Sequence, residues 1–361
     1  MSEKLDDSTI PNDQIDIYGE IDVSTKRLTP SNDREFKLLI QGYNIDYSII
    51  NAIRRTIMMS IPVYSFHRSN IQIDSEKSYH MYNNDLLYNQ IETLPIFDIP
   101  NYFDLEDPQT YLPTEIMKRI FGTFVQDSTE PEDTTQGQNE DTKEDTKKKL
   151  LNIELTISIK NTAETSKFVS THDAILKING KVSNSYQNRK PISIMVLKPR
   201  EELHLKAQAN LGISKMSAIY EATTNAIHRE LSPTKYELEY ETLEQLNKDV
   251  IYTKALTILI KKLEALKRFI KQTYAEKEKT EKVEIQLYGE DHTLGNLLAT
   301  ILQKCEFIVR AGYVMPHPFV DQVNIVYQLS EKAKGKKPIG ILIDSISYLI
   351  KLFTTIRDLA K

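Results

Sequence analysis

Asp291 and His292 are neighbouring side chains whose types could support catalysis. A histidine beside a carboxylate can act as a general base, but no nucleophile or orienting residue is spaced with this pair. A second acidic cluster, Asp104-Leu-Glu-Asp107, precedes a proline and is typical of a turn. His317 stands between two prolines, which favour a rigid turn over a ligand. None of these groups predicts a catalytic site.

The sequence also lacks the short motifs that carry common chemistries. It contains no Gly-x-x-x-x-Gly-Lys, no Gly-x-Gly-x-x-Gly, no His-Glu-x-x-His and no Gly-x-Ser-x-Gly. Its single cysteine, Cys305, cannot form an intramolecular disulfide and leaves a cysteine-rich zinc site short of thiolates. The formal net charge of -5 argues against a protein that mainly coats nucleic acid. We expect no catalytic residue, no metal and no cofactor.

Basic side chains are the remaining candidates for a functional site. If the isoleucines around them face the core, Arg54 and Arg55 fall on the exposed or flanking side of a helix. They form either a solvated polar face or a docking site, because the guanidinium fork suits charged and planar partners. Lys334, Lys336 and Lys337 form a basic loop, which is either a solvated turn or a contact with nucleic acid or another protein.

The elements that position these residues are separated by polar stretches. Residues 1–30 are polar and interrupted by prolines, which predicts an arm with a short strand around 15–23. Residues 126–149 contain no aliphatic or aromatic side chain, and eight acids face four lysines. Such a segment cannot offset its ordering entropy by burial, which predicts a disordered loop. Alternating apolar and polar residues predict half-buried strands over 151–159 and 202–209.

Two long helical patterns lie in the second half of the chain. Apolar residues recur at spacings of three and four over 250–272 and again over 339–360, so each pattern predicts a helix with one apolar seam. The two seams either pack on each other or cover separate sheets. The expected pairing residues are Leu256, Leu259, Leu263 and Leu266 in the first helix and Ile346, Leu349, Phe353 and Ile356 in the second.

An internal repeat links the two halves of the chain, because 46–57 aligns with 291–302 at a constant offset. In each copy an acidic or hydroxyl side chain precedes an apolar helical face and can cap the first backbone N–H groups. This helix start is common enough to arise by chance, but an asparagine at the same position in both copies favours a duplicated strand–turn–helix unit. The helix-start residues are Asp46, Ser48 and Asn51 in one copy and Asp291, His292, Thr293 and Asn296 in the other.

These motifs resemble those of the alpha-like subunits of multisubunit RNA polymerases. Glu290-Asp-His-Thr-Leu-Gly-Asn-Leu-Leu and Ala311-Gly-Tyr-Val-Met-Pro-His-Pro resemble the small alpha-like subunit, which is the archaeal L subunit or the eleventh of polymerase II. Asn51-Ala-Ile-Arg-Arg-Thr-Ile and Leu211-Gly-Ile-Ser-Lys-Met-Ser-Ala resemble its larger partner, the archaeal D subunit or the third of polymerase II. One chain with both partners resembles the fused subunit of large cytoplasmic DNA viruses of the asfarvirus type.

The resemblance implies a role and partners. The alpha-like pair is the platform on which the second-largest and then the largest catalytic subunits assemble, and it performs no chemistry itself. A small subunit equivalent to the tenth or twelfth of polymerase II is a further implied partner, whereas DNA is reached only through the complex. The implied docking residues are Asn51, Arg54, Arg55 and Lys215. Many relatives carry a metal-binding cysteine cluster in an inserted domain, which this chain lacks.

We therefore predict an α+β protein in which two alpha-like half-domains form an intramolecular pseudo-twofold dimer, with an inserted, mostly β domain and no homo-oligomer. The alternative function is a free-standing DNA-binding adaptor or transcription factor with the same fold. Without a signal peptide or an 18-residue apolar run, we expect a soluble protein of the host cytoplasm, with the virion as a second location. The expected parts are an arm (1–30), a first half-domain (31–62 with 233–275), an insert (63–232), a linker (276–282) and a second half-domain (283–361).

Overall fold

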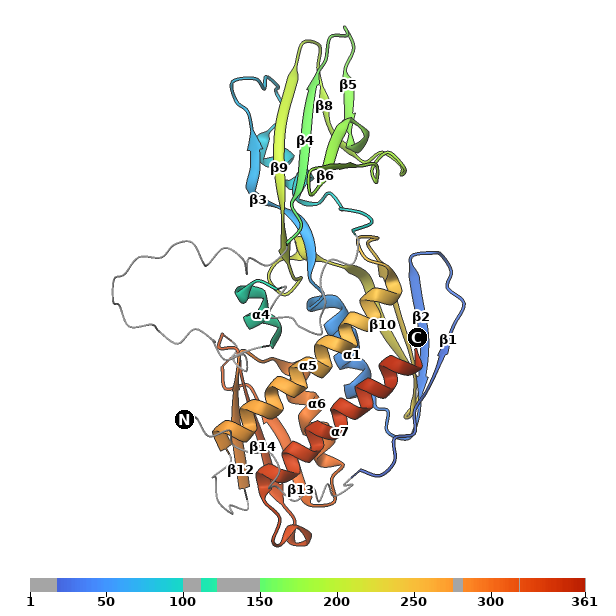
Figure 1. Ribbon diagram of the computed structural model, residues 1–361, viewed down its shortest axis with the longest axis vertical. Helices are drawn as coiled ribbons and strands as arrows, with labels where there is room; N and C mark the ends of the chain where they lie inside the picture. Colours follow the sequence, from blue (N-terminus) through green and yellow to red (C-terminus); the bar gives the residue numbers. More distant parts are fainter. Residues whose placement is uncertain (1–17, 100–111, 122–149, 275–281, 318, 361) are drawn as a thin grey trace, which may run out of the picture.

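The computed structural model describes residues 18–99, 112–121, 150–274, 282–317 and 319–360. It shows two half-domains, each with an antiparallel sheet, a short helix and a long helix, and an inserted β domain that projects from them (Figure 1). This arrangement confirms the predicted α+β fold with two alpha-like halves.

The first half-domain is built on a four-stranded antiparallel sheet in the order β1-β2-β11-β10. Phe36, Leu38 and Ile40 alternate along β2 and are buried, because successive side chains of a strand point to opposite faces and one face covers the core. The elements are β1 (Ser24–Arg27), β2 (Glu35–Gln41), α1 (Tyr47–Met59), β10 (Thr223–Ser232), β11 (Lys235–Thr242) and α5 (Lys248–Tyr274).

The second half-domain repeats this order of elements on three strands. In both halves a strand leads into a short capped helix, a hairpin follows, and a long helix comes last. The sheet order β12-β14-β13 matches β2-β11-β10, so the internal repeat is visible in the topology. The elements are β12 (Lys282–Tyr288), α6 (His292–Gln303), β13 (Ile308–Val314), β14 (Gln322–Leu329), the 3₁₀ turn η5 (Glu331–Ala333) and α7 (Pro338–Leu359).

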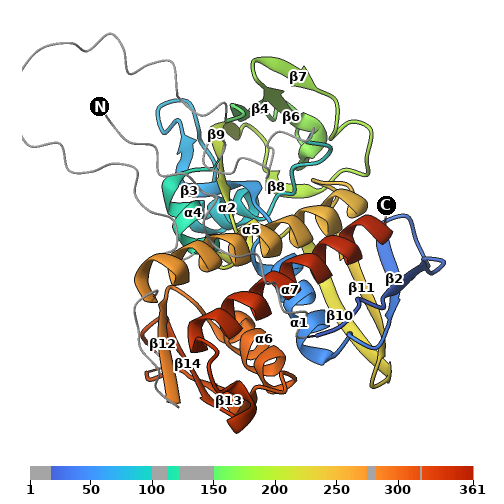
Figure 2. The ribbon, with the colours of Figure 1, turned by 60° about the horizontal axis from the view of Figure 1, so that its bottom comes forward.

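The long helices α5 and α7 run side by side across the two half-domains (Figure 2). One continuous cluster of buried apolar residues has members from both halves, so the halves share a core. Among the described helices, α7 alone is long and apolar enough to cross a membrane, but it packs against α5 and α6. The cluster includes Leu256, Leu259, Leu263, Leu266, Ile346, Leu349, Phe353 and Ile356.

The inserted domain has a five-stranded antiparallel sheet in the order β3-β9-β4-β6-β7, a two-stranded ribbon of β5 and β8, and a core of its own. The strands expected over 151–159 and 202–209 correspond to β4 and β9. The elements are β3 (Val63–Ile73), α2 (Asn84–Glu92), β4 (Ile153–Lys160), β5 (Lys167–Ser170), η3 (Thr171–Asp173), β6 (Ala174–Ile178), β7 (Lys181–Ser183), β8 (Ser193–Leu197) and β9 (Glu202–Gly212). The 3₁₀ turn η4 (Ala218–Tyr220) follows β9, and its Tyr220 joins the core shared by the half-domains.

Two strands belong to a part of the fold other than the expected one. β10 lies within the expected insert, 63–232, but it pairs with β11 in the sheet of the first half-domain. Pro233 therefore marks the turn of a hairpin and not a domain boundary. β1 lies within the expected arm, 1–30, but it pairs with β2, and it begins at Ser24, after the strand expected around 15–23.

Helix α4 (Thr114–Phe121) also departs from the expected domains. Ile116, Met117, Ile120 and Phe121 join the core shared by the half-domains instead of the core of the insert. Their helical spacing gives α4 one apolar side, which is enough to hold it on that core. The expected acidic loop at 126–149 lies outside the described residues, and so does the linker 276–282 apart from its last residue.

Candidate subunit-docking site

The two repeated helix starts are helix caps. The Asp46 side chain accepts hydrogen bonds from the backbone N–H groups of Ser48, at 2.7 Å, and Ile49, at 3.2 Å. The Asp291 side chain accepts one from the N–H of Thr293 at 2.8 Å. Both caps have extended backbone, as N-cap residues do. The sequence pattern that the two helix starts share therefore corresponds to the same local structure.

Each cap is also contacted by a basic side chain of the opposite half-domain. Arg55 of α1 donates from Nε to Oγ1 of Thr293 at 2.7 Å, and its Nη2 lies 3.7 Å from Oδ2 of Asp291. In return, Nζ of Lys304, which caps the C-terminus of α6, lies 2.5 Å from Oδ2 of Asp46. The caps thus tie the two half-domains together, and Arg55 belongs to the junction between them.

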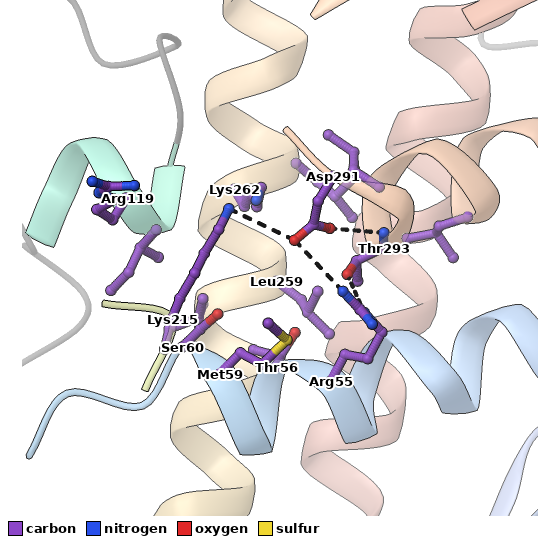
Figure 3. Close-up of a pocket in the computed structure, with 15 residues that line it drawn as sticks. Arg55, Thr56, Met59, Ser60, Arg119, Lys215, Leu259, Lys262, Asp291 and Thr293 are labelled. Carbon is purple, nitrogen blue, oxygen red and sulfur yellow. Dashed lines mark hydrogen bonds and ion pairs between the residues drawn. The ribbon is translucent and has the colours of Figure 1, made fainter. Parts of the chain in front are cut away.

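A pocket opens at this junction, where α1, α4, α5, the segment after β9 and the start of α6 meet. We call it the seam pocket, and it is open to solvent at its mouth. Figure 3 shows Arg55, Lys215 and Thr293 converging on Asp291, with Arg119 on the opposite wall. Its lining residues are Arg55, Thr56, Met59, Ser60, Arg119, Ile120, Lys215, Ile258, Leu259, Lys262, Leu263, Asp291, Thr293, Leu294 and Leu297.

The charges around the seam pocket are mostly basic. Nζ of Lys215 lies 3.6 Å from Oδ2 of Asp291, and Nζ of Lys262 lies 2.6 Å from Oε2 of the fully buried Glu290. Burial alone would raise the pKa of Asp291, but the bonds from Thr293 and the nearby lysines lower it to about 2. Burial raises the pKa of Glu290, against the pull of Lys262. The ionised Asp291 is therefore held by its basic neighbours.

Arg54 points away from this junction, toward β10. Its Nη2 donates to Oδ1 of Asn51 at 2.9 Å, and its Nη1 donates to Sδ of Met58 at 3.1 Å and to the carbonyl of Ala226 at 3.4 Å. β10 is irregular next to this contact, because its register against β11 shifts between Thr224 and Ile227 and Asn225 has a φ of 50°. Arg54 and Arg55 therefore do not form one surface, although they are adjacent in sequence.

The surface around Arg54 combines exposed apolar side chains with polar ones. Tyr47 and Met58 are 50% and 38% exposed. We call this surface, with Asn51 and Arg54, the α1–β10 face. Its mixture of aromatic, methionine and arginine side chains is typical of protein interfaces.

The other chemically interesting residues have structural environments. Nδ1 of His292 lies 3.1 Å from the hydroxyl of Tyr313, and Asn296 is half-buried on α6. Cys305 is buried, and the described ranges hold no group of three His, Cys, Asp or Glu side chains that could bind a metal. The acidic cluster at 104–107 lies outside the described residues.

The basic loop precedes α7 and partly folds back on the second half-domain. Lys334 ends η5, and Lys337 is the residue before the first turn of α7. Nζ of Lys336 lies 3.7 Å from the ring centroid of Phe307, a cation–π contact. At least one of the three lysines is therefore engaged within the chain.

Sequence reasoning missed Arg119, Lys262 and Glu290 as members of these sites. Glu290 directly precedes the cap Asp291, and this position could have indicated that it lies near the site. Lys262 flanks the apolar seam of α5, but helical spacing does not reveal which buried acid faces it. Arg119 lies within the segment expected to belong to the insert, so nothing in its sequence pattern indicated a place at the junction of the half-domains.

Two family models, both described as the RNA polymerase Rpb3/Rpb11 dimerisation domain, match this chain over residues 39–263 and 282–359. The chain therefore belongs to the Rpb3/Rpb11 dimerisation-domain family of RNA polymerase subunits, with both partners in one polypeptide. It is 50% identical over 353 residues, 98% of each chain, to a protein of Acanthamoeba polyphaga mimivirus provisionally named as a DNA-directed RNA polymerase subunit.

Shorter relatives match the second half-domain. The chain is 31% identical over 78 residues to the DNA-directed RNA polymerase subunit Rpo11 of Metallosphaera sedula, which is 22% of this chain and 87% of that protein. It is 36% identical over 78 residues to Rpo11 of Saccharolobus shibatae, 74% of that protein. These findings confirm the resemblance to a fused viral alpha-like subunit, since the mimivirus protein matches this chain over nearly its full length.

Proposed function

We propose that this chain is a non-catalytic assembly platform that holds the two large catalytic subunits of a viral DNA-dependent RNA polymerase. The observation that carries the proposal is the shared core of the half-domains, which presents α1 of the first and α6 of the second as one rigid unit. A rigid unit with exposed mixed surfaces suits docking of larger proteins. A small subunit equivalent to the tenth or twelfth of polymerase II is a further partner in this proposal, and the host cytoplasm is its location.

We propose the α1–β10 face as the surface that docks a large subunit. Arg54 is fixed by Asn51 and by the Ala226 carbonyl, so little side-chain entropy remains to be lost on binding. Around it, Tyr47 and Met58 supply apolar area. A fixed arginine surrounded by partly exposed apolar groups has the composition of a binding hot spot.

The test is affinity purification of the tagged full chain from infected cells. Two co-purifying subunits above roughly 100 kDa are expected with the wild type, a size bound that separates large catalytic subunits from single domains. Arg54→Glu should reduce their recovery at least tenfold, because a carboxylate in a hot spot leaves the partner's groups unpaired. Arg200→Glu makes the same charge change at an exposed position of the insert and should recover them fully. Full recovery with Arg54→Glu, with an unchanged melting temperature, would remove this face from the proposal.

Arg54 and Arg55 need separate variants in this experiment. Arg55→Glu would place a carboxylate beside Asp291 and remove the donor to Thr293, so it would also weaken the pairing of the half-domains. A double variant would therefore confuse lost docking with lost folding.

The second candidate is a free-standing DNA-binding adaptor, which the basic residues Lys334 and Lys337 favour. Such a protein should bind a DNA duplex alone, with an affinity that falls steeply as salt rises. A platform subunit should bind the same duplex weakly at every salt concentration. Fluorescence anisotropy of the purified chain separates these outcomes.

A further inference from the structure

The seam pocket carries more positive charge than its own acids neutralise. Arg55, Arg119, Lys215 and Lys262 line it, and Asp291 is the acidic residue of the lining. Lys262 is paired with Glu290, which is completely buried beneath it. Within the described part of the chain Arg119 has no acidic partner, while Arg55 and Lys215 share the single carboxylate of Asp291 at 3.7 and 3.6 Å.

These cations are partly withdrawn from water, which strengthens their attraction for an anion. The side chains of Arg55, Lys215 and Lys262 are 27%, 17% and 16% exposed. At such positions the effective dielectric constant is well below that of water. The attractive Coulomb energy of an ion pair is therefore several times larger there than at an open surface. The pocket is open at its mouth, so a group from outside can reach it.

The floor of the seam pocket indicates what kind of anion fits. Beneath the charged rim it is apolar, formed by Ile258, Leu259, Leu263, Leu294 and Leu297. An aspartate or glutamate side chain matches both layers, because its methylene groups can lie on the apolar floor while its carboxylate reaches the rim. Inorganic phosphate has no apolar part and would leave the floor uncovered.

We propose that the seam pocket receives an acidic side chain from another polymerase subunit, bound between Arg119 and Lys215. This inference rests on the proposed platform function and specifies the chemistry of the partner. The pocket draws residues from α1 and α5 of the first half-domain, from the start of α6 of the second, and from α4. The pocket is therefore complete only when the two half-domains are paired. Binding of the acidic side chain thus requires correct pairing before a large subunit can be held stably.

The test uses charge reversal in the tagged full chain within the purified polymerase. Arg119→Glu should leave the chain folded, because Arg119 is on the exposed side of α4, and should reduce retention of the large subunits at least tenfold. Lys215→Met removes the charge without placing an acid beside Asp291 and should reduce retention by a smaller factor. Lys26→Glu, on the exposed side of β1, is the matched control and should retain them fully. Equal retention by Arg119→Glu and Lys26→Glu overturns the inference.

A crosslinking arm separates this inference from the proposed function. A photoreactive residue at position 119 should crosslink to a subunit peptide that contains an aspartate or glutamate. Changing that acid to lysine should restore retention of the Arg119→Glu chain. Wild-type chain that retains no large subunit overturns both proposals, whereas normal retention with no acidic crosslink overturns only this one. Stabilisation of the wild type, but not of Arg119→Glu, by inorganic phosphate with retention unchanged would show a free-anion site and also overturn it.

Discussion

Asp291 combines two tasks in one side chain. Its carboxylate caps α6 through Thr293 and also receives Arg55 and Lys215. Burial alone would raise its pKa, but the hydrogen bonds from Thr293 and the charges of Lys262 and Lys215 lower it to about 2 from 3.8. A carboxyl whose pKa is lower in the folded state stabilises the fold above its unfolded pKa, and this contribution is lost as pH falls through the folded value.

Asp291→Asn should therefore lower the free energy of unfolding by about 2 kcal/mol at neutral pH, since each pKa unit corresponds to about 1.4 kcal/mol. The difference from wild type should shrink below pH 3.8 and vanish only below about pH 2. Asparagine remains a good N-cap, so the decrease in the free energy of unfolding comes from the lost charge and not from a lost cap. Urea denaturation at several pH values measures it, with the exposed Asp33→Asn as control. A loss that is constant with pH would contradict the assignment.

Gly295 is the residue at which α6 approaches its sheet most closely. A Cβ added there would lie 2.6 Å from the ring of Tyr313 on β13. Gly295→Ala should therefore destabilise the protein by about 1–3 kcal/mol, the usual cost of overpacking. At Gly340 in α7 the nearest atom to an added Cβ would be 3.7 Å away, so Gly340→Ala should be neutral or slightly stabilising. Thermal unfolding compares the two, and equal melting temperatures would refute the close contact.

At the scale of elements, the two long helices are the part of the fold that the sequence predicted best. Their apolar seams show in the spacing alone, and the ends of α5 (Lys248–Tyr274) and α7 (Pro338–Leu359) differ from the expected ones by at most two residues. Spacing identifies the apolar side of a helix but not its partner, so the pairing itself rested on the internal repeat.

Leu349→Ala should destabilise the protein by about 2–5 kcal/mol, because Leu349 is fully buried on the seam of α7 and alanine leaves a cavity. Leu359→Ala, at the 48% exposed end of the same helix, should change stability by less than about 0.5 kcal/mol. Equilibrium urea unfolding gives both values. Similar small effects at both positions would mean that the seam does not hold the half-domains together.

The boundaries of elements and domains were harder to predict. The turn at Pro233 suggested the end of a domain, whereas it joins two strands of one sheet. The seam pocket was also hidden, since Arg119 and Lys262 come from chain segments whose meeting depends on the tertiary fold. The caps Asp46 and Asp291 were predictable because their role is local to a few residues.

At the scale of the molecule, the shared core makes the link between the half-domains dispensable once they have folded. A protease site inserted within 276–281 should yield two fragments that elute together in native size-exclusion chromatography, because residues of both halves form one apolar cluster. The fragments should separate only in denaturant. The uncut chain is the control, and separation under native conditions would show that the shared core is too weak to hold the pair.

The intact chain should also be monomeric, because each half-domain already has its partner. Light scattering over a wide range of protein concentration should give one mass near 41.7 kDa. A mass that doubles at high concentration would indicate exchange of half-domains between chains.

The joining of α5 to β12 in one polypeptide, with fewer than ten residues between Tyr274 and Lys282, has a consequence for how the pairing is maintained. A short tether holds its ends at an effective concentration in the millimolar range, far above that of a separate subunit in a cell. The two partners are always present in equal numbers, and dilution does not part them. Their interface therefore needs much less intrinsic affinity than that of two free subunits. Because less affinity is needed, the interface can include features that lower the stability of the fold, such as the buried pair of Lys262 and Glu290.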